Sequence, residues 1–323
     1  MNYFFLWNYN KLPFVYSIMK ENEKNILIIN IHDCPEMEAT LSGLQDLSRI
    51  HKIYFIKNNF QECLFNIFYR VFIYPFKIKK EKINFYLDGF VDFYPIYLAN
   101  IGTPDQVYFY EEGESIYQDN VLFVKEKNGL KSKLGDVVKK LLFIKKNSIY
   151  GISIFYVRDK IRLLNAIENK MSSGFSFLIE EVDDVEYIKN MPISDKNVIE
   201  KVFFVDQCFE VFKSQSKTQK KRAIILTQPT YLYGLHSKDE IAGIFNCYIR
   251  NLINENYDVF LKLHPSEKED LYLLNNVKRI NGRFPFEFLA IFNVIFDLGV
   301  TYNSTAIKSS LIRDKLLIQD LSC

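Results

Sequence analysis

Three short polar stretches follow apolar runs of the chain and carry side chains that can move protons or bind anions. Ligands of parallel α/β sheets bind beyond the carboxyl ends of the strands, so residues at such positions are candidates for a functional site. The stretches are Glu111-Glu112-Gly113 after QVYFY, His264-Pro265 after YDVFLKL, and Tyr302-Asn303-Ser304-Thr305 after NVIFDLG. Together they predict a site with an acid, an imidazole and a set of hydroxyls.

The acid pair and the histidine have the types expected for proton transfer. Glu111 and Glu112 precede a glycine in a tight turn, which suits a general base working near neutral pH. Pro265 fixes φ and has no N–H, so the chain leaves its strand in a defined direction and aims His264. That imidazole can donate to a phosphate oxygen or act as a general acid. The alternatives are an ordinary polar turn and a hydrogen-bonded histidine at a domain edge.

The third stretch and a nearby acid suit anion and sugar binding. Ser304 and Thr305 open an expected helix, where hydroxyls and N–H groups either cap the helix or bind an anion. Glu287 opens the aromatic segment PFEFLAIF and could accept hydrogen bonds from ribose hydroxyls or cap a helix. A diphosphate leaving group usually recruits Mg²⁺ through an acid pair, whereas a monophosphate can be held by histidine and hydroxyls. The set therefore favours sugar transfer from a nucleoside monophosphate.

Several familiar motifs are absent. The chain has no GxGxxG after a strand, no GxxxxGK[ST], no HExxH and no GxSxG, so dinucleotide, P-loop, zincin and hydrolase interpretations lack their central residues. The acidic cluster EEVDD at 180–184 is interpreted as a solvated loop or a helix start rather than a metal site.

The elements that must position these residues alternate between strands and helices. Strands are expected at 3–7, 25–30, 52–57, 83–88, 106–111, 121–125, 201–205, 223–228, 257–263, 293–299 and 315–320. Helices are expected near 11–21, 36–47, 59–72, 238–253, 267–275 and 304–312. The polar stretch at 213–222 is typical of a linker. This pattern predicts an α/β protein with parallel sheets and two Rossmann-like domains, 1–212 and 213–323, around a cleft.

Composition excludes other classes. A formal net charge of +2 over 323 residues argues against a nucleic-acid binder. No stretch of 18 apolar residues occurs, and the start MNYFFLWNYNK is a poor signal peptide. The five cysteines are scattered, which fits reduced thiols in a cytoplasm. The basic runs at 77–82 and 131–146 are expected to be solvated faces, although the second could touch an anionic membrane surface.

The order of the polar stretches resembles that of bacterial sialyltransferases, most closely the lipooligosaccharide and capsule enzymes of glycosyltransferase family 52. Those families share a D/E-D/E-G motif, an HP motif and a later S-S/T motif. Here the motifs read Glu111-Glu112-Gly113, His264-Pro265 and Ser304-Thr305. Phe286-Glu287-Phe288-Leu289 is similar to the family segment whose glutamate holds the cytidine ribose. The resemblance spans 111 to 305.

This resemblance implies a GT-B fold and inverting, metal-independent transfer from CMP-sialic acid, usually CMP-Neu5Ac. The acceptor would be a galactose-type hydroxyl of a bacterial surface glycan, such as a capsule or lipooligosaccharide, and could be lipid-linked. Domain 1–212 would lie on the acceptor side and domain 213–323 would bind the donor. No cofactor, metal or nucleic acid is expected, and the protein would be cytoplasmic, with peripheral contact at the inner face of the membrane as an option.

The resemblance also assigns roles to residues. Glu111 or Glu112 would deprotonate the acceptor, and His264 would neutralise or protonate the departing phosphate. Further residues would complete the donor site: Gly113, Pro265, Glu287, Ser304 and Thr305.

Two loops depart from the family pattern. Many relatives carry a Thr-Pro signature where this chain has Trp7-Asn8-Tyr9-Asn10, and relatives often place acids where it has Tyr231-Leu232-Tyr233. Asp239 is therefore a reserve candidate for the base.

Three other functions stay open. The chain could be another nucleotide-dependent transferase with a CDP-glycerol or UDP-sugar donor, since an HP pair after a strand also occurs in enzymes resembling the CDP-glycerol glycerophosphotransferases. It could be a non-hydrolysing sugar-nucleotide epimerase, or a non-catalytic glycan-binding partner on the same scaffold.

Overall fold

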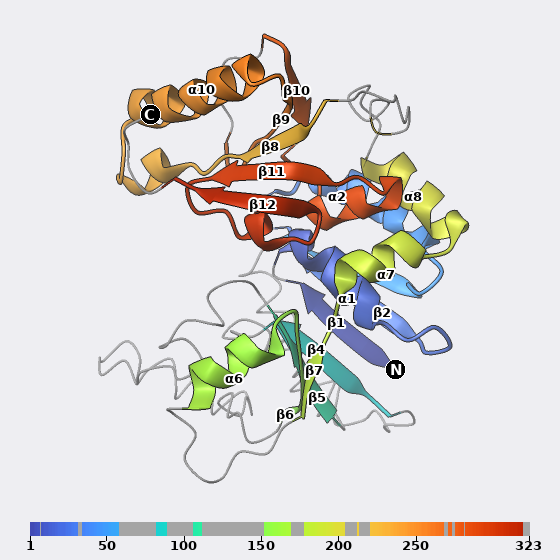
Figure 1. Ribbon diagram of the computed structural model, residues 1–323. Coiled ribbons are helices and arrows are strands. Elements are labelled where there is room, and N and C mark those ends of the chain that lie inside the picture. Colours follow the sequence, from blue (N-terminus) through green and yellow to red (C-terminus); the bar gives the residue numbers. More distant parts are fainter. Residues whose placement is uncertain are drawn as a thin grey trace. The chain divides into compact units, whose positions relative to one another are not determined.

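The computed structural model contains two compact units, Met1–Asp184 and Val185–Cys323 (Figure 1). The residues that it describes are 1–6, 8–31, 34–57, 82–88, 106–111, 152–168, 178–203, 212, 220–267, 271–272, 275–280 and 282–318.

The first unit is built on a parallel sheet of seven strands in the order β3-β2-β1-β4-β5-β6-β7. The strands are β1 (Asn2–Leu6), β2 (Asn25–Asn30), β3 (Lys52–Ile56), β4 (Asn84–Asp88), β5 (Gln106–Tyr110), β6 (Ile152–Val157) and β7 (Leu178–Glu181). Strand order reverses between β1 and β4, and such a reversal is where ligands bind beyond the carboxyl ends of a doubly wound sheet.

Both faces of this sheet are apolar, as expected for a parallel sheet. Phe85 and Phe109 lie on one face, in a buried cluster that includes Leu163 of α6 (Lys160–Glu168). On the other face Tyr86 stacks between Phe4 and Tyr108, with ring centroids 4.1 and 4.5 Å away. Alternating side chains therefore bury opposite faces of the same strands.

Short helices complete the described part of the first unit. They are η1 (Tyr9–Lys11), α1 (Leu12–Ile18), α2 (Met37–Ser42) and η2 (Gly43–Asp46). Pro13 lies in the first turn of α1, where its missing N–H leaves no intrahelical hydrogen bond unmade. Phe14 of α1 is fully buried beside Tyr110, with ring centroids 6.4 Å apart, so α1 is anchored near the carboxyl end of β5.

The second unit contains a parallel sheet of five strands in the order β10-β9-β8-β11-β12. The strands are β8 (Arg222–Leu226), β9 (Asp258–Lys262), β10 (Val277–Ile280), β11 (Phe296–Thr301) and β12 (Ile312–Leu317). Its order reverses between β8 and β11, so the residues that follow these two strands occupy the position at which a doubly wound sheet binds its ligand.

Helices and 3-10 turns precede or connect these strands. They are α7 (Asp184–Asn190), α8 (Ile193–Phe203), η8 (Thr230–Tyr233), α10 (Lys238–Asn254), η9 (Phe286–Phe292) and η10 (Thr305–Lys308). The apolar stripe of α10 packs on Val259 and Leu261 of β9, whereas Phe260 points to the opposite face and stacks on Phe212 at 5.0 Å. Lys262 has the same parity as Phe260 and so lies on the aromatic face.

The predicted parallel α/β class is confirmed, and most predicted strands fall within a few residues of their observed positions. The strand predicted at 201–205 is wrong over 201–203, which end helix α8. The helix predicted at 304–312 is wrong because only a 3-10 turn forms at Thr305–Lys308, followed by β12 from Ile312. β11 begins at Phe296 rather than at 293, and the described residues within 267–275 are not helical.

Other predictions lie wholly or largely outside the described residues: those at 59–72, 77–82, 121–125, 131–146 and the linker at 213–222. The units divide at Asp184/Val185 rather than at 212/213, and α8 packs within the second unit through Phe203, whose ring lies 5.6 Å from that of Phe288.

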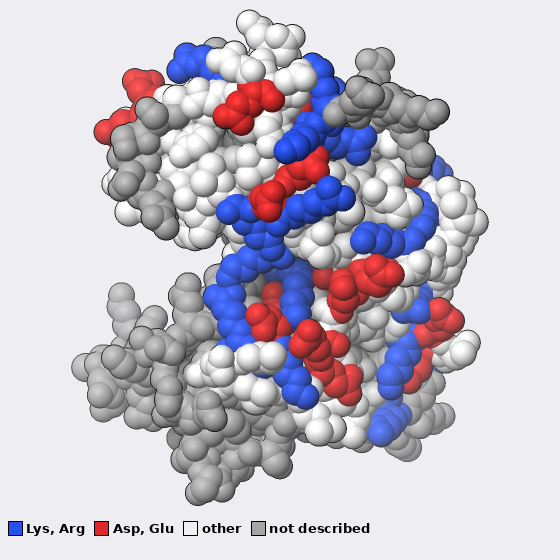
Figure 2. Space-filling model, in the orientation of Figure 1, with Lys and Arg blue, Asp and Glu red and all other residues white. Residues whose placement is uncertain are grey.

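The surface and the cysteines bear on the predictions from composition. Lysine and arginine side chains stand among aspartates and glutamates over the face drawn in Figure 2. Of the helices in the described ranges, none is both long and apolar enough to cross a membrane. Cys34 has a free thiol, but Cys247 is disulfide-bonded, so the expectation of reduced thiols is wrong for Cys247.

Candidate functional site

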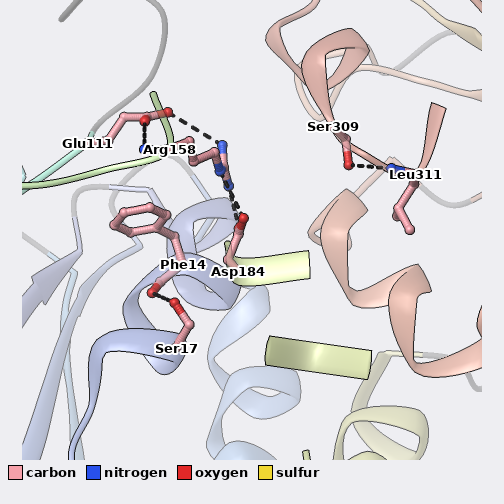
Figure 3. A network of polar contacts seen from close by, with 7 residues as sticks. All are labelled: Phe14, Ser17, Glu111, Arg158, Asp184, Ser309 and Leu311. Carbon is pink, nitrogen blue, oxygen red and sulfur yellow. Dashed lines mark hydrogen bonds and ion pairs between the residues drawn. The ribbon is translucent and has the colours of Figure 1, made fainter. Parts of the chain in front are cut away.

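The predicted base, Glu111, lies directly after β5 and is only 4% exposed. Its Oε2 accepts the backbone N–H of Arg158 at 2.9 Å, and its Oε1 lies 3.5 Å from Nη1 of the same arginine (Figure 3). The carboxylate therefore faces the end of the neighbouring strand β6. Glu112 and Gly113 lie outside the described residues.

Arg158 is the centre of this cluster. It follows β6, and its Nε and Nη2 donate to Oδ1 and Oδ2 of Asp184 at 3.0 and 2.6 Å, a bidentate pair (Figure 3). Its guanidinium lies 5.4 Å from the centroid of the Phe14 ring. Sequence reasoning missed Arg158 because it missed the strand ISIFYV, although that β-branched and aromatic run is a strong strand signal. Asp184 belongs to the EEVDD cluster and begins α7, as the helix-start interpretation predicted.

In the second unit, His264 comes two residues after β9 and is held by its backbone. Its N–H donates to Thr227 Oγ1 and to Glu267 Oε2, both at 2.9 Å. The backbone N–H of Ser266 donates to the ring nitrogen Nδ1 at 3.2 Å. Because Nδ1 accepts, the neutral imidazole carries its proton on Nε2 and presents that N–H as a donor.

Glu267 holds the turn that contains His264 and Pro265. Besides the His264 N–H, its carboxylate accepts the hydroxyl of Thr227 and the hydroxyl of Tyr272, the latter at 2.5 Å. Thr227 directly follows β8, so the turn after β9 is bonded to the end of its neighbouring strand. Glu267 could not be singled out from the sequence, because its role depends on Thr227, which lies 40 residues away.

Two basic side chains of this edge are desolvated. Burial, together with the nearby charge of Lys262, lowers the pKa of His264 from 6.5 to about 4. Burial likewise lowers the pKa of Lys262 to about 8, although the carboxylate of Glu287 opposes this shift. The Nζ of Lys262 donates to the carbonyl of Gly282 at 3.1 Å and lies 5.3 Å from the ring centroid of Phe284. His264 is therefore neutral at neutral pH, and the positive charge resides on Lys262.

Gly282 permits a close approach of two backbones. A Cβ at this position would lie 2.5 Å from the carbonyl oxygen of Leu263 and 3.4 Å from that of His264. The segment before η9 thus packs directly against the turn that carries His264. Glu287, in the first turn of η9, is 8% exposed and belongs to this assembly through its electrostatic interaction with Lys262.

Ser304 and Thr305 follow β11, the other strand at the reversal of strand order. The N–H of Ser304 donates to Thr301 Oγ1 at 3.0 Å, and Thr301 donates to the carbonyl of Leu226 at 2.7 Å. The Ser304 side chain makes no capping hydrogen bond, so the capping role is not realised. The four-residue turn η10 is too short for the expected helix dipole, which leaves the hydroxyls as its anion-binding groups.

The structure therefore brings the second and third polar stretches to one place. His264 is bonded to Thr227 and the Ser304 backbone is bonded through Thr301 to Leu226, and these two residues of the β8 end are consecutive. Asp239 is exposed in the first turn of α10, beside the capping box formed by Ser237 and Glu240. Glu111 lies in the first unit, and its meeting with the second-unit residues stays a prediction.

In the part of the chain that the structure describes, no group of three or more histidine, cysteine, aspartate or glutamate side chains is arranged to hold a metal ion.

Comparisons with known proteins give the fold a broader context. No protein-family model matches the chain, and no curated protein matches it either. The α/β-galactoside α-2,3-sialyltransferase of Photobacterium phosphoreum is similar in structure, with 15% identity, a TM-score of 0.56, and coverage of 97% of this chain and 88% of that one.

Two epimerases share the fold as well. The UDP-GlcNAc 2-epimerase of Neisseria meningitidis has 12% identity and a TM-score of 0.53, with 99% and 83% of the two chains covered. A putative UDP-GlcNAc 2-epimerase of Listeria monocytogenes has 11% identity and a TM-score of 0.51, covering 95% of this chain and 75% of that one. The paired parallel sheets and these neighbours confirm the predicted GT-B fold.

Proposed function

We propose that the protein is an inverting, metal-independent sialyltransferase that moves sialic acid from CMP-sialic acid to a galactose-type hydroxyl of a bacterial surface glycan. The observation that carries the proposal is the His264 turn. A neutral imidazole, oriented through Nδ1 by the Ser266 N–H, lies at the carboxyl edge of a parallel sheet beside the hydroxyl-bearing stretch after β11. A phosphate monoester can be held by such donors without a metal ion.

The reaction assigned to this site is a displacement at the anomeric carbon of sialic acid. The acceptor hydroxyl oxygen forms the new bond to that carbon as the bond to the CMP phosphate oxygen breaks, and CMP leaves with the electron pair. A base takes the acceptor proton. Donors preorganised around the phosphate stabilise the negative charge that develops there, which is the largest contribution in many enzymes.

His264 and Lys262 would stabilise the phosphate in different ways. The Nε2–H of His264 donates a hydrogen bond without carrying charge, because the pKa of His264 lies near 4. Lys262, two residues earlier and on the aromatic face of the sheet, supplies positive potential from a buried position. Ser304 and Thr305 add hydroxyl donors, while Glu287 and the HP turn complete the donor site.

The acceptor side is assigned to the first unit. Glu111 or Glu112 would take the acceptor proton, with Asp239 of the second unit in reserve. The sialyltransferase of Photobacterium phosphoreum lends support because it shows that a chain with this fold can use sialic acid chemistry on galactosides. The epimerases make a UDP-sugar the main competing ligand.

The test uses CMP-sialic acid and a panel of labelled galactosides, with CMP release and labelled product followed together. Wild-type protein should release CMP and form a product that a sialidase cleaves, without added metal and in the presence of a chelator. His264→Ala should lower the rate about 10²–10³-fold, since it removes one preorganised donor. His51→Ala, an exposed histidine just before β3, is the matched control and should keep the rate.

Two outcomes would contradict the proposal. The first is protection from thermal unfolding by UDP-GlcNAc or CDP-glycerol but not by CMP or CMP-sialic acid, which favours the epimerase or the other transferases. The second is binding of CMP-sialic acid and galactosides with no CMP release, which favours a non-catalytic glycan-binding protein.

A further inference from the structure

The two oxygens of the Glu111 carboxylate are both directed at Arg158. One accepts its backbone N–H at 2.9 Å and the other lies 3.5 Å from its guanidinium. The Glu111 side chain is 5% exposed. A general base must come within hydrogen-bond reach of the hydroxyl that it deprotonates. Both oxygens of Glu111 are already engaged with Arg158, so a hydroxyl would have to share them or draw the carboxylate away from the end of β6.

Arg158 is itself fixed in place. Its bidentate pair with Asp184, at 3.0 and 2.6 Å, and the Phe14 ring beneath it leave one orientation for the guanidinium. The Asp184 side chain is 3% exposed and that of Arg158 is 29% exposed. Moving Glu111 away would deprive a largely buried cation of one of its two carboxylates, which is costly in a low-dielectric setting.

We infer that Glu111 is not the base but a positioning residue, and that Arg158 and Asp184 are positioning residues with it. The three residues join the ends of β5 and β6 to the start of α7. This inference rests on the proposed sialyl transfer. Of the acids named above, it leaves Glu112 and Asp239 as candidates for the base.

The same sheet supplies a matched control at the amino end of its outermost strand, β3. Arg49 precedes β3, donates to the Met19 carbonyl at 2.8 Å and to Glu21 at 2.6 Å, and lies 5.9 Å from the Tyr16 ring centroid. Its side chain is 13% exposed. Arg49 and Arg158 are thus both largely buried arginines with a carboxylate and an aromatic ring, but only Arg158 lies at the carboxyl edge.

The experiment measures kcat, donor KM, the pH–rate profile and thermal unfolding for Glu111→Gln, Arg158→Lys, Arg49→Lys, Glu112→Gln and Asp239→Asn. Glu111→Gln keeps an acceptor for the Arg158 N–H and should lower kcat no more than about tenfold, with the acid limb of the profile unchanged. Arg158→Lys loses the bidentate fork and should lower kcat about 10–100-fold at constant donor KM. Arg49→Lys should lower the unfolding temperature without changing kcat.

One of the two remaining acids should behave as the base. Its amide variant should lose about 10²–10⁴-fold in kcat together with the acid limb. The inference is overturned if Glu111→Gln shows that loss, or if Arg49→Lys and Arg158→Lys lower kcat equally, since the cluster would then act through stability alone. Absence of turnover by the wild-type protein would sink the proposed function, and this inference with it.

Discussion

The carboxyl edges of the two sheets keep charge near a prospective ligand in different ways. In the first unit Arg158 lies between Glu111 and Asp184, so each charge there has an opposite charge at short range. In the second unit His264 and Lys262 lie in surroundings that disfavour their charged forms, and burial lowers the pKa of both. One edge holds its charges by pairing, and the other holds a neutral imidazole beside a lysine whose charged form burial disfavours.

This difference indicates what each edge is built for. A paired cluster keeps its geometry, which suits the orientation of a neutral acceptor. A desolvated cation gains more from an incoming anion than an exposed one, because the anion restores the electrostatic stabilisation lost on burial. The second edge is therefore the better place for a phosphate.

The largest expected effect comes from breaking the paired edge. Arg158→Ala leaves the largely buried carboxylates of Glu111 and Asp184 without their shared cation and should lower the free energy of unfolding by about 3–5 kcal/mol. Urea unfolding at neutral pH measures this change. The triple variant Glu111→Gln, Arg158→Met, Asp184→Asn removes all three charges together and should recover most of the loss. A triple variant as unstable as Arg158→Ala would show that packing, not charge pairing, holds this edge.

The second edge should be more sensitive to shape than to charge. The Cβ of Gly282→Ala would meet backbone atoms of Leu263 at 2.5 and 3.1 Å, and backbone cannot rotate away as a side chain can. We expect a loss of about 2 kcal/mol in unfolding free energy and weaker CMP binding, because the His264 turn must shift. Calorimetric titration with CMP and thermal unfolding measure the two effects.

Gly243 of α10 is the control for that substitution. A Cβ there meets nothing within 4 Å, so Gly243→Ala should stabilise the helix by about 0.5–1 kcal/mol. Equal effects at Gly282 and Gly243 would argue against a steric reason for glycine before η9.

The two units also show which elements of the fold can be predicted from the sequence. Strand runs such as NILIIN at 25–30 have four consecutive apolar residues between two asparagines, and this pattern alone gives the position of β2. The helix prediction after β11 failed although the apolar residues of TAIKSSLI have helical spacing. The 3-10 turn ends at Lys308, and the chain then pairs β12 with β11. That pairing is long-range, and local spacing carries no information about it.

The site shows the same limit. His264, Glu287, Ser304 and Glu111 could be singled out because their residue types and strand-end positions are local features. The lowered pKa of His264 could not be predicted, because it is caused by burial and by the nearby charge of Lys262. Nor could Arg158 be recognised as the partner of Glu111, because parallel strand pairing brings together residues that lie 47 positions apart.

The second edge should also make stability depend on pH. Because the pKa of His264 falls from 6.5 to about 4 on folding, the folded protein binds fewer protons than the unfolded chain between these values. Stability should therefore decrease as pH falls from 6.5 toward 4, by up to about 1.4 kcal/mol per pH unit. The charged groups facing this histidine's turn, Lys262 and Glu267, are unchanged in His264→Asn, so subtracting the two pH–stability curves isolates the imidazole. Parallel curves would contradict the lowered pKa.

The smallest effect is expected where an ion pair is exposed. Arg313 of β12 lies 3.0 Å from Asp297, but the Arg313 side chain is 65% exposed, so water and salt screen the pair. Arg313→Ala should change the unfolding free energy by no more than about 0.5 kcal/mol. Asp297→Ala should cost more, about 1–2 kcal/mol, because Asp297 also accepts the backbone N–H of Arg222 at 2.9 Å and positions the start of β8. A loss at Arg313 as large as that at Arg158 would mean that burial does not distinguish the two pairs, and with it the contrast between paired and desolvated edges would lose its physical basis.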